Sequence, residues 1–374
     1  MSRKARGVVE VVDDAGDRPY DDRLETLRSS LGLDGLSGLL VFDPVNIRYL
    51  TGFTGSAGVV LVRPDECLLV SDFRYRVQAR EQAPVARFVE LEGAFSPLAP
   101  ELVEGFEGCL GVEKDHLKVE EWEALAPALE GLDVSLVRGH VRKMRRVKSA
   151  GELRAVREAS LLAVQVMERL SLMQVVGRTE RDVALELEVW ARKHGSEGIP
   201  FPYILAWGPN SAKPHAEPGD TVIGQGGLLV VDLGAVVDGY ASDITRTFST
   251  GKVGPEEARA HRVTLEAQEA ARREAGPGIA CRHVDKVARD VIEGEGLGDF
   301  FKHGLGHGVG LEVHEEPGLS SRSEDVLEPG MVVTIEPGIY LEGVGGVRIE
   351  DSVAVTETGV EVLTEMDRGL LTLS

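Results

Sequence analysis

Cysteine, long apolar runs and basic charge are all scarce in this chain of 374 residues. The three cysteines, Cys67, Cys109 and Cys281, lie far apart and form no CxxC pair, which argues against a zinc knuckle or a redox motif. No apolar run reaches the roughly 18 residues that cross a bilayer, and the N-terminus lacks the apolar core of a signal peptide. These absences predict a protein of the reducing cytoplasm with no membrane partner.

The charge balance narrows the range of partners. Lysine and arginine together number 41 against 62 aspartates and glutamates, which gives a formal net charge of −21. Such a surface repels polyanions, so we expect no nucleic-acid partner, whereas small molecules, peptides and metal cations remain. With 43% hydrophobic residues, a chain of this length predicts two domains of modest size.

The N-terminal third predicts an extension followed by a small α/β domain. Residues 1–22 are polar, and we interpret them as a flexible extension or one added by cloning. From residue 23 to 140, short apolar runs alternate with amphipathic stretches, a pattern typical of α/β structure. The expected elements are a helix over 23–31, strands over 38–42, 58–63 and 67–71, and a helix over 73–81.

The boundary between the domains is predicted near residue 140. Ser149, with Glu152 three residues further on, forms a capping box for a long helix that ends at about residue 173. The basic stretch 140–148 directly precedes this helix, so the second domain is expected to cover residues 141–374.

The second domain contains an internal near-repeat with a period of about one hundred residues. In each copy a helix is followed by an apolar strand with an acid, a turn, and a second strand with another acid. The helices begin near Gly177 and Gly278, and the acids are Asp232 and Asp243 in the first copy and Glu336 and Glu350 in the second. The repeat predicts an α+β fold of two helix-and-hairpin halves related by a pseudo-twofold axis.

The register of the first hairpin brings its two acids together. Asp238-Gly239 is a strong signal for a two-residue turn, which would place Gly234 opposite Asp243. Asp232 lies two residues from Gly234 and therefore on the same face of the strand. Four partly buried acids would repel one another unless cations neutralise them, and two metals about 3.5–4 Å apart are the usual solution in a hydrolytic site.

Three of the nine histidines, His303, His307 and His314, fall within a glycine-rich stretch of twelve residues between the two hairpins. Imidazole is a common ligand of transition metals, so His307 is a candidate ligand. A plainer interpretation stays open at this point, in which the glycines form a tight loop, the histidines are core or surface groups, and each acid is a solvated strand residue.

Several segments resemble the signature of the "pita-bread" metallopeptidases, over essentially residues 24–370. They are Asp232-Leu-Gly-Ala with Ser-Asp243-Ile-Thr-Arg-Thr-Phe, His303-Gly-Leu-Gly-His307 with Val-His314-Glu, Ile335-Glu336-Pro-Gly-Ile-Tyr, and Val347-Arg-Ile-Glu350-Asp. The family includes methionine aminopeptidase, Xaa-Pro aminopeptidase, Xaa-Pro dipeptidase and the metal-free creatinase. Segments 46–56 and 71–75 also resemble the creatinase-type N-terminal domain, which methionine aminopeptidases lack, so the Xaa-Pro branch is favoured.

The resemblance implies a site with two divalent metal ions, of manganese, cobalt or zinc. Asp232 would bind one ion, Asp243 and Glu350 would bridge both, and His307 with Glu336 would complete the second. The ions would activate a water that attacks the carbonyl before proline, and Glu336 would accept the proton and pass it to the proline nitrogen.

The resemblance also implies roles around the metals. His215 and His314 match histidines that polarise the scissile carbonyl, His303 matches one beside the proline pocket, and Arg348 matches an arginine that orients carboxylates, although an ordinary strand salt bridge would explain Arg348 equally well. Phe201 and Tyr203 are candidates for the substrate cleft, and they are equally compatible with a place in the core.

The expected substrates are peptides with proline at the second position, and the choice between dipeptidase and aminopeptidase stays open. Compact prolidases often carry an arginine shortly after the His-Glu pair, where this chain has Gly318, although Arg48, Arg74, Arg322 or Arg368 could replace it. A metal-free creatinase-like hydrolase and a non-catalytic peptide-binding module are the alternatives. The family leads us to expect a homodimer, with the N-terminal domain of one subunit near the cleft of the other.

Overall fold

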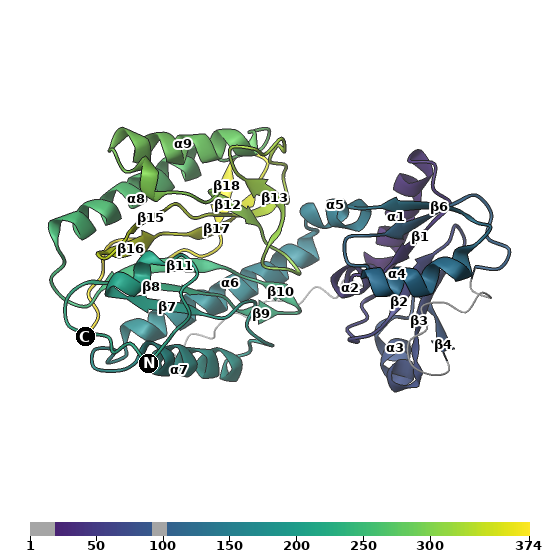
Figure 1. Cartoon of the computed structure of the whole chain (residues 1–374), viewed down its shortest axis with the longest axis horizontal. Helices are drawn as coiled ribbons and strands as arrows, with labels where there is room; N and C mark the ends of the chain where they lie inside the picture. The colour runs from purple at the N-terminus through teal and green to yellow at the C-terminus, as the bar shows by residue number, and fades with distance from the viewer. Residues whose placement is uncertain (1–18, 92–102) are drawn as a thin grey trace, which may run out of the picture. The chain divides into compact units, whose positions relative to one another are not determined.

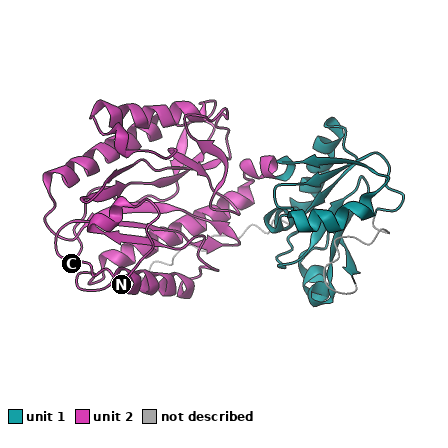
Figure 2. Ribbon diagram, viewed as in Figure 1, with its two compact units in different colours: residues 1–141 teal, residues 142–374 magenta. Residues whose placement is uncertain are grey.

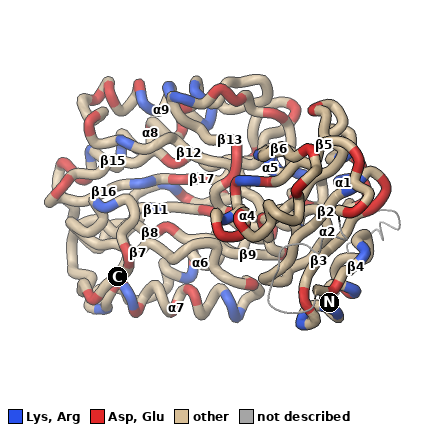
Figure 3. Tube along the Cα trace, turned by 45° about the vertical axis from the view of Figure 1, so that its right-hand side comes forward, with Lys and Arg blue, Asp and Glu red and all other residues tan. Residues whose placement is uncertain are grey.

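The computed structural model describes residues 19–91 and 103–374 (Figure 1). The chain divides into two compact units, residues 1–141 and 142–374 (Figure 2). The sequence predicted that the N-terminal domain ends at residue 140, and this domain boundary stays a prediction. Acidic and basic residues are interspersed along the described elements of both units (Figure 3). No described helix is both long enough and apolar enough to cross a membrane.

Unit 1 is built on a six-stranded sheet in the order β4-β3-β2-β1-β5-β6. Strand β2 runs antiparallel to both of its neighbours, β1 and β3, whereas β4 is parallel to β3, β5 is parallel to β1, and β6 is parallel to β5. The strands are β1 (Gly38–Val41), β2 (Val59–Val62), β3 (Cys67–Asp72), β4 (Arg87–Leu91), β5 (Cys109–Glu113) and β6 (Asp133–Val137). The helices are α1 (Pro19–Leu33), α2 (Pro44–Thr51), α3 (Arg76–Gln82) and α4 (Val119–Leu125), while α5 (His140–Arg146) crosses the division between the units.

The first helix corrects our interpretation of residues 1–22 as an extension. Residues 1–18 lie outside the described residues, but α1 begins at Pro19, so residues 19–22 belong to a helix. Leu24, Leu27 and Leu31 recur at helical spacing and are buried, which explains why this segment packs against the sheet. The polar side chains of the first turn concealed the start of the helix, although proline is typical of a first helical position.

Unit 2 consists of two halves with the same order of elements. The first half has α6 (Ala150–Ser171), α7 (Glu180–Lys193), β7 (Ile204–Trp207), β8 (Leu228–Leu233), the short pair β9 (Val236–Val237) and β10 (Tyr240–Ala241), and β11 (Ile244–Ser249). The second has α8 (Pro255–Glu274), α9 (Cys281–Gly294), β12 (Gly306–Gly308), β13 (Glu315–Leu319), β14 (Val332–Ile335), the pair β15 (Gly338–Leu341) and β16 (Gly345–Arg348), β17 (Asp351–Val355) and β18 (Val360–Val362). Strands of the first half pair in the order β11-β8-β7, and those of the second in the order β13-β12-β14-β17-β18.

Each helix pair packs mainly against the strands of its own half, although Ala155 and Val156 of α6 share a core cluster with Val332 and Ala354 of the second half. Figure 1 shows α6 and α7 on one side of the strands of unit 2 and α8 and α9 on the other side. One core cluster joins Leu170 and Leu187 to Val231, and another joins Val263 and Val284 to other strand residues. The predicted capping box forms, because Ser149 Oγ accepts from the Glu152 amide and the Glu152 carboxylate accepts from the Ser149 amide. The predicted α+β fold with an internal repeat is confirmed.

Candidate metal centre

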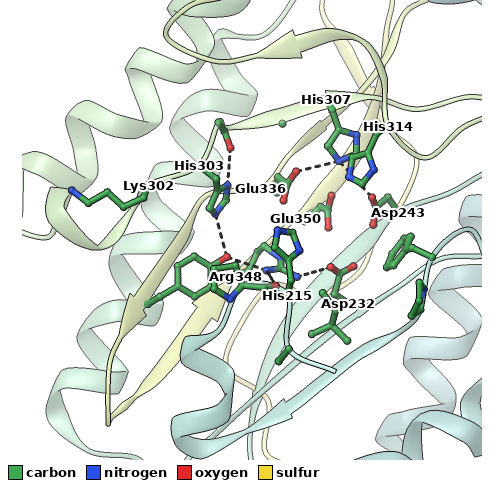
Figure 4. Close-up of a pocket in the computed structure, with 18 of the residues that line it drawn as sticks. His215, Asp232, Asp243, Lys302, His303, His307, His314, Glu336, Arg348 and Glu350 are labelled. Atoms are coloured by element: carbon green, nitrogen blue, oxygen red, sulfur yellow. Dashed lines mark hydrogen bonds and ion pairs between the residues drawn. The ribbon is translucent and has the colours of Figure 1, made fainter. Parts of the chain in front are cut away.

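Four acidic residues stand at matching positions in the two halves of unit 2. Asp232 lies near the end of β8, and Asp243 directly precedes β11. Glu336 directly follows β14, and Glu350 directly precedes β17. Figure 4 shows the four carboxylates around one space, although they come from two separate sheets. The repeat therefore brings together acids that are up to 118 residues apart in sequence.

The register of the first hairpin is the one that its turn predicts. Asp238-Gly239 forms the turn, with φ of 48° and 76°, the left-handed values that this two-residue turn requires. Leu233 pairs with Ile244, so the same register places Gly234 opposite Asp243. The glycine at this turn is thus a determinant of how the two aspartates approach each other.

One histidine joins the acids. His307 lies in β12, and its Nε2 is 3.3 Å from Glu336 Oε1 and 3.7 Å from Asp243 Oδ2. One ligating atom each from Asp243, His307 and Glu350 lies within 4.8 Å of the others, a spacing that could hold a metal ion. The structure therefore brings all five predicted ligands to one place.

Burial makes this group of acids electrostatically costly. Burial, and then the neighbouring charges of Glu350 and Asp232, raise the pKa of Asp243 well above its usual value. Burial, and then Glu336 and Asp232, do the same to the pKa of Glu350. Without a cation, burial and the repulsion between neighbouring acids therefore disfavour the charged forms of these two carboxyl groups.

The other two acids have cationic partners. Burial raises the pKa of Asp232, and Arg348, whose guanidinium donates to its Oδ2, opposes the shift. Burial also acts to raise the pKa of Glu336, but the hydrogen bond with His307 and the charges of His307, Arg348 and His303 together outweigh it, so the pKa of Glu336 is lowered. Burial acts to lower the pKa of His307, but the hydrogen bond with Glu336, the charges of Glu336 and Asp232, and the hydrogen bond to the Gly308 carbonyl together raise it.

Three carboxylate oxygens of this group lack a hydrogen-bond donor among the described residues. Asp232 Oδ1, Asp243 Oδ1 and Glu350 Oε1 are buried and find no hydrogen-bond partner among residues 19–91 and 103–374. A buried acceptor without a donor costs about 1–3 kcal/mol, and a charged one costs more. Divalent cations take oxygen ligands of this kind together with imidazole, so the residues present fit a metal site.

The acids lie on the wall of a cavity of about 720 Å³. Every other residue that the sequence predicted for catalysis or substrate binding also lines it: Phe201, Tyr203, His215, His303, His314 and Arg348. The His314 ring lies beside the His307 ring, with centroids 4.2 Å apart, and His215 is exposed to the cavity. Figure 4 shows the three histidines His215, His303 and His314 on different sides of the carboxylates.

The two aromatic candidates differ in how far they enter the cavity. Phe201 is half-buried, so part of its ring is available to a ligand. Tyr203 is only 5% exposed, belongs to the core beneath β8, and donates its hydroxyl to the Gly234 carbonyl at 3.0 Å. Tyr203 therefore has a structural contact that Phe201 lacks.

Sequence reasoning assigned no role to Tyr340, which lines the same cavity. Its hydroxyl accepts from Arg348 at 3.0 Å and lies 3.1 Å from Nε2 of His303. Arg348 also donates to the carbonyl of Pro214 and to Thr245 Oγ1. Tyr340 stands four residues after Glu336 in a segment that carried the family resemblance, which was the available signal.

Cations other than histidine line the cavity at two described positions, Arg348 and Lys302. The Arg348 guanidinium is already bound by its four partners, whereas Lys302 is largely exposed and pairs with Asp299 at 3.1 Å. Arg368 is one of the arginines that could take the role of the arginine that compact prolidases carry where this chain has Gly318. Its guanidinium is bound to Asp351 and Glu365.

Comparison with known proteins decides the family. A model described as "Metallopeptidase family M24" matches residues 154–357, and one described as "Creatinase/Prolidase N-terminal domain" matches residues 23–147. The chain belongs to metallopeptidase family M24. It is therefore a peptidase of a divalent-metal-dependent family, and the resemblance seen in the sequence is confirmed.

Three M24 relatives match nearly the whole chain. The Xaa-Pro dipeptidase of Pyrococcus furiosus is 35% identical over 94% of this chain and 99% of its own length. The solved structure "Xaa-Pro dipeptidase from Bacillus anthracis" is 38% identical with a TM-score of 0.91, covering 95% of this chain and all of that one. The solved X-Pro aminopeptidase from Thermotoga maritima is 34% identical with a TM-score of 0.84, covering 93% and 99%. Both activities thus occur among M24 proteins of this architecture.

Proposed function

We propose that this chain is a dinuclear-metal Xaa-Pro peptidase, which hydrolyses the bond between an N-terminal residue and a following proline. The observation that carries the proposal is the set of three buried carboxylate oxygens that have no donor among the described residues, on side chains that line a cavity together with His307 and Glu336. The names of the M24 relatives supply the substrate class, since they are described as acting on Xaa-Pro peptides.

The five residues that converge on the cavity would hold two divalent cations. Asp232 would bind one ion, His307 and Glu336 the other, and Asp243 and Glu350 both. When bound, such ions supply an activated water and stabilise negative charge on the carbonyl oxygen. Manganese, cobalt and zinc all suit a set of four carboxylates and one imidazole, so the identity of the metal depends on supply.

The remaining polar residues of the cavity would act on the peptide. Glu336 would accept a proton from the attacking water and pass it to the proline nitrogen. His314 and His215 would donate hydrogen bonds to the carbonyl oxygen as charge develops on it, and His303 would lie beside the proline ring. Burial lowers the pKa values of His314 and His303, which favours the neutral rings, and a neutral imidazole can donate one N–H.

Proline in the second position fits the apolar part of the cavity. A proline nitrogen has no N–H, so a site cannot select proline by a hydrogen bond to that atom and must accept the ring by shape. The described lining supplies apolar groups for this contact, namely Phe201, Pro202, Ile204, Pro214 and Phe300.

Metal content separates this proposal from its alternatives. A creatinase-like hydrolase or a peptide-binding module would purify without metal, whereas we expect about two ions per chain. The activity test compares Ala-Pro with Ala-Pro-Ala, with manganese added and after chelation. Cleavage of both peptides indicates an aminopeptidase, cleavage of Ala-Pro alone indicates a dipeptidase, and cleavage of neither by the metal-loaded protein refutes the proposal.

Two expectations about the protein in the cell remain predictions. We expect a homodimer, which sedimentation analysis would test, and a cytoplasmic location, which fractionation would test. Peptides with proline at the second position are the expected partners, and nucleic acid and membranes are not expected to bind, given the net charge of −21.

A further inference from the structure

Behind His314 lies a buried ionic network that the proposed reaction does not use. Arg145 in α5 and Lys148 just after it are 3% and 1% exposed, and both bind the carboxylate of Glu315, which is 5% exposed. Lys148 Nζ is 3.2 Å from Glu315 Oε2, and the Arg145 guanidinium donates to Glu315 Oε1 and, at 2.7 Å, to Glu312 Oε2. Two cations of the basic stretch 140–148 thus bind two acids of the loop around His314. The sequence alone indicated no functional role for this stretch.

The network is joined to the cavity wall by a peptide bond, because Glu315 of the network directly follows His314 of the wall. Glu315 begins β13 and follows His314, and neighbouring residues in an extended chain point to opposite sides. His314 accordingly faces the cavity while Glu315 faces Arg145 and Lys148. Within residues 19–91 and 103–374 no hydrogen bond fixes the His314 ring, so its position depends on its backbone and on packing against His307.

The loop before His314 is also built around the Glu315 carboxylate. Glu315 Oε1 accepts from the Glu312 amide at 3.1 Å, and a side chain at Gly310 would meet Glu315 Oε2 at 2.6 Å. The Gly310 carbonyl accepts from Ala241 in β10 at 2.7 Å, which links the loop to the other half of unit 2. A change in the charge of this network therefore has a direct path to the backbone that carries His314.

We propose that Lys148 and Arg145 are positioning residues for His314, acting through the Glu315 carboxylate. This inference rests on the proposed Xaa-Pro peptidase function, in which His314 contacts the scissile carbonyl. Hydrogen-bond donors contribute to catalysis only when they lie close to the position of the developing oxyanion, so a shift of about 1 Å is enough to reduce the rate.

The test uses the full-length, manganese-loaded protein with Ala-Pro as the substrate. Lys148→Met leaves Glu315 short of one cation and risks unfolding, so the decisive variant is the double change Lys148→Met with Glu315→Gln, which keeps the charge balanced. We expect a normal Tm and metal content, a kcat at least about tenfold lower, and a KM within about threefold of the wild type. In the crystal structure of this double variant we expect the His314 ring to be displaced from His307.

Repeating the double change in a His314→Ala protein distinguishes an effect on the position of His314 from a general effect on the fold. If Lys148 and Glu315 act through His314, their double change should lower the residual kcat of His314→Ala by less than about twofold. Arg146→Met is the matched control, because Arg146 lies only two residues before Lys148 but pairs with Asp325 at 2.7 Å and not with Glu315. We expect this control to keep kcat within about twofold of the wild type.

Each outcome decides between the two proposals. An unmoved His314 ring with unchanged kcat in the double variant, or an equal loss of rate in the His314→Ala background, overturns the positioning role. If the wild type cleaves neither Ala-Pro nor Ala-Pro-Ala, the proposed function fails instead, and the crystal structure of the double variant still tests whether the network positions the ring.

Discussion

The Thr245 hydroxyl donates a hydrogen bond to Glu350 Oε2 at 2.7 Å and thereby joins β11 of the first half to an acid of the second half. The Thr245 hydroxyl oxygen also accepts a hydrogen bond from Arg348 Nε at 3.1 Å, and the Glu350 amide donates to the Thr245 carbonyl at 3.1 Å. One threonine therefore orients both Glu350, a candidate metal ligand, and the arginine that binds Asp232. This contact places the candidate metal centre at the junction between the two halves.

Replacing Thr245 with valine should weaken metal binding without unfolding the protein. Valine preserves the shape of the side chain but leaves Glu350 Oε2 without its donor, and loss of such an orienting bond typically costs 10–100-fold in metal affinity. Manganese titration against a competing chelator measures the change. Thr245→Ser retains the hydroxyl and should stay within about threefold of the wild type. Equal affinities for the valine and serine variants would contradict the role of this bond.

Removing Asp243 should have opposite effects on stability with and without metal. In the metal-free protein a charge on Asp243 would be buried and repelled by Glu350 and Asp232, so Asp243→Asn should raise the free energy of unfolding by about 1 kcal/mol. In excess manganese the same variant should be less stable than the wild type, because it binds the ions more weakly.

Thermal unfolding in EDTA and in manganese checks this reversal. Asp290→Asn is a suitable control, since Asp290 lies on the exposed face of α9 and pairs only with Lys286 at 2.6 Å in the described structure. Its Tm relative to the wild type should be the same in both buffers. A lower Tm for Asp243→Asn in EDTA would show that the carboxylate stabilises the metal-free fold.

Much of the metal centre could be predicted because its determinants are local in sequence. Alternation along β8 and the turn at Asp238-Gly239 are enough to place Asp232 and Asp243 on one face, and the repeat extends the same logic to Glu336 and Glu350. Each step needs only a short stretch of chain and a known strand period.

The contacts that sequence reasoning missed join segments with no shared pattern. Tyr340 meets His303 across 37 residues and Arg145 meets Glu315 across 170, and both contacts depend on how separately folded elements pack. Charge and aromatic character alone would suit many other partners. The roles of Phe201 and Tyr203 stayed open for the same reason, because the depth of a ring in a core is set by its tertiary neighbours.

Metal binding should release protons, and metal affinity should rise with pH. The pKa values of Asp243, Glu350 and His307 are raised in the metal-free protein, and all three groups must be deprotonated to bind a cation. Glu336, whose pKa is lowered, is already ionised and contributes no proton near neutrality. Calorimetric titration with manganese in buffers of different ionisation enthalpy measures the number released.

The stability of the metal-free protein should show the complementary trend. An acid whose pKa is raised by folding destabilises the fold above that raised value, and the penalty disappears as the pH falls towards its ordinary value near 4. Asp243 and Glu350 therefore predict that EDTA-treated protein gains stability as the pH is lowered from neutrality within that window. No proton release on binding, together with a flat pH profile in EDTA, would contradict the buried-charge account.

Phe201 and Tyr203 should respond to mutation in opposite ways. Phe201→Ala removes apolar surface from the cavity, and at roughly 25 cal/mol per Å² the loss of about 40 Å² of contact would raise KM for Ala-Pro about fivefold, with Tm nearly unchanged. Tyr203→Phe removes the hydrogen bond to Gly234 from a buried site, so it should lower the free energy of unfolding by about 1 kcal/mol and leave KM nearly unchanged. Steady-state kinetics give KM for each variant, and thermal unfolding gives the stability of each. A KM that rises for Tyr203→Phe and not for Phe201→Ala would move the proline pocket away from Phe201 and towards the base of β8.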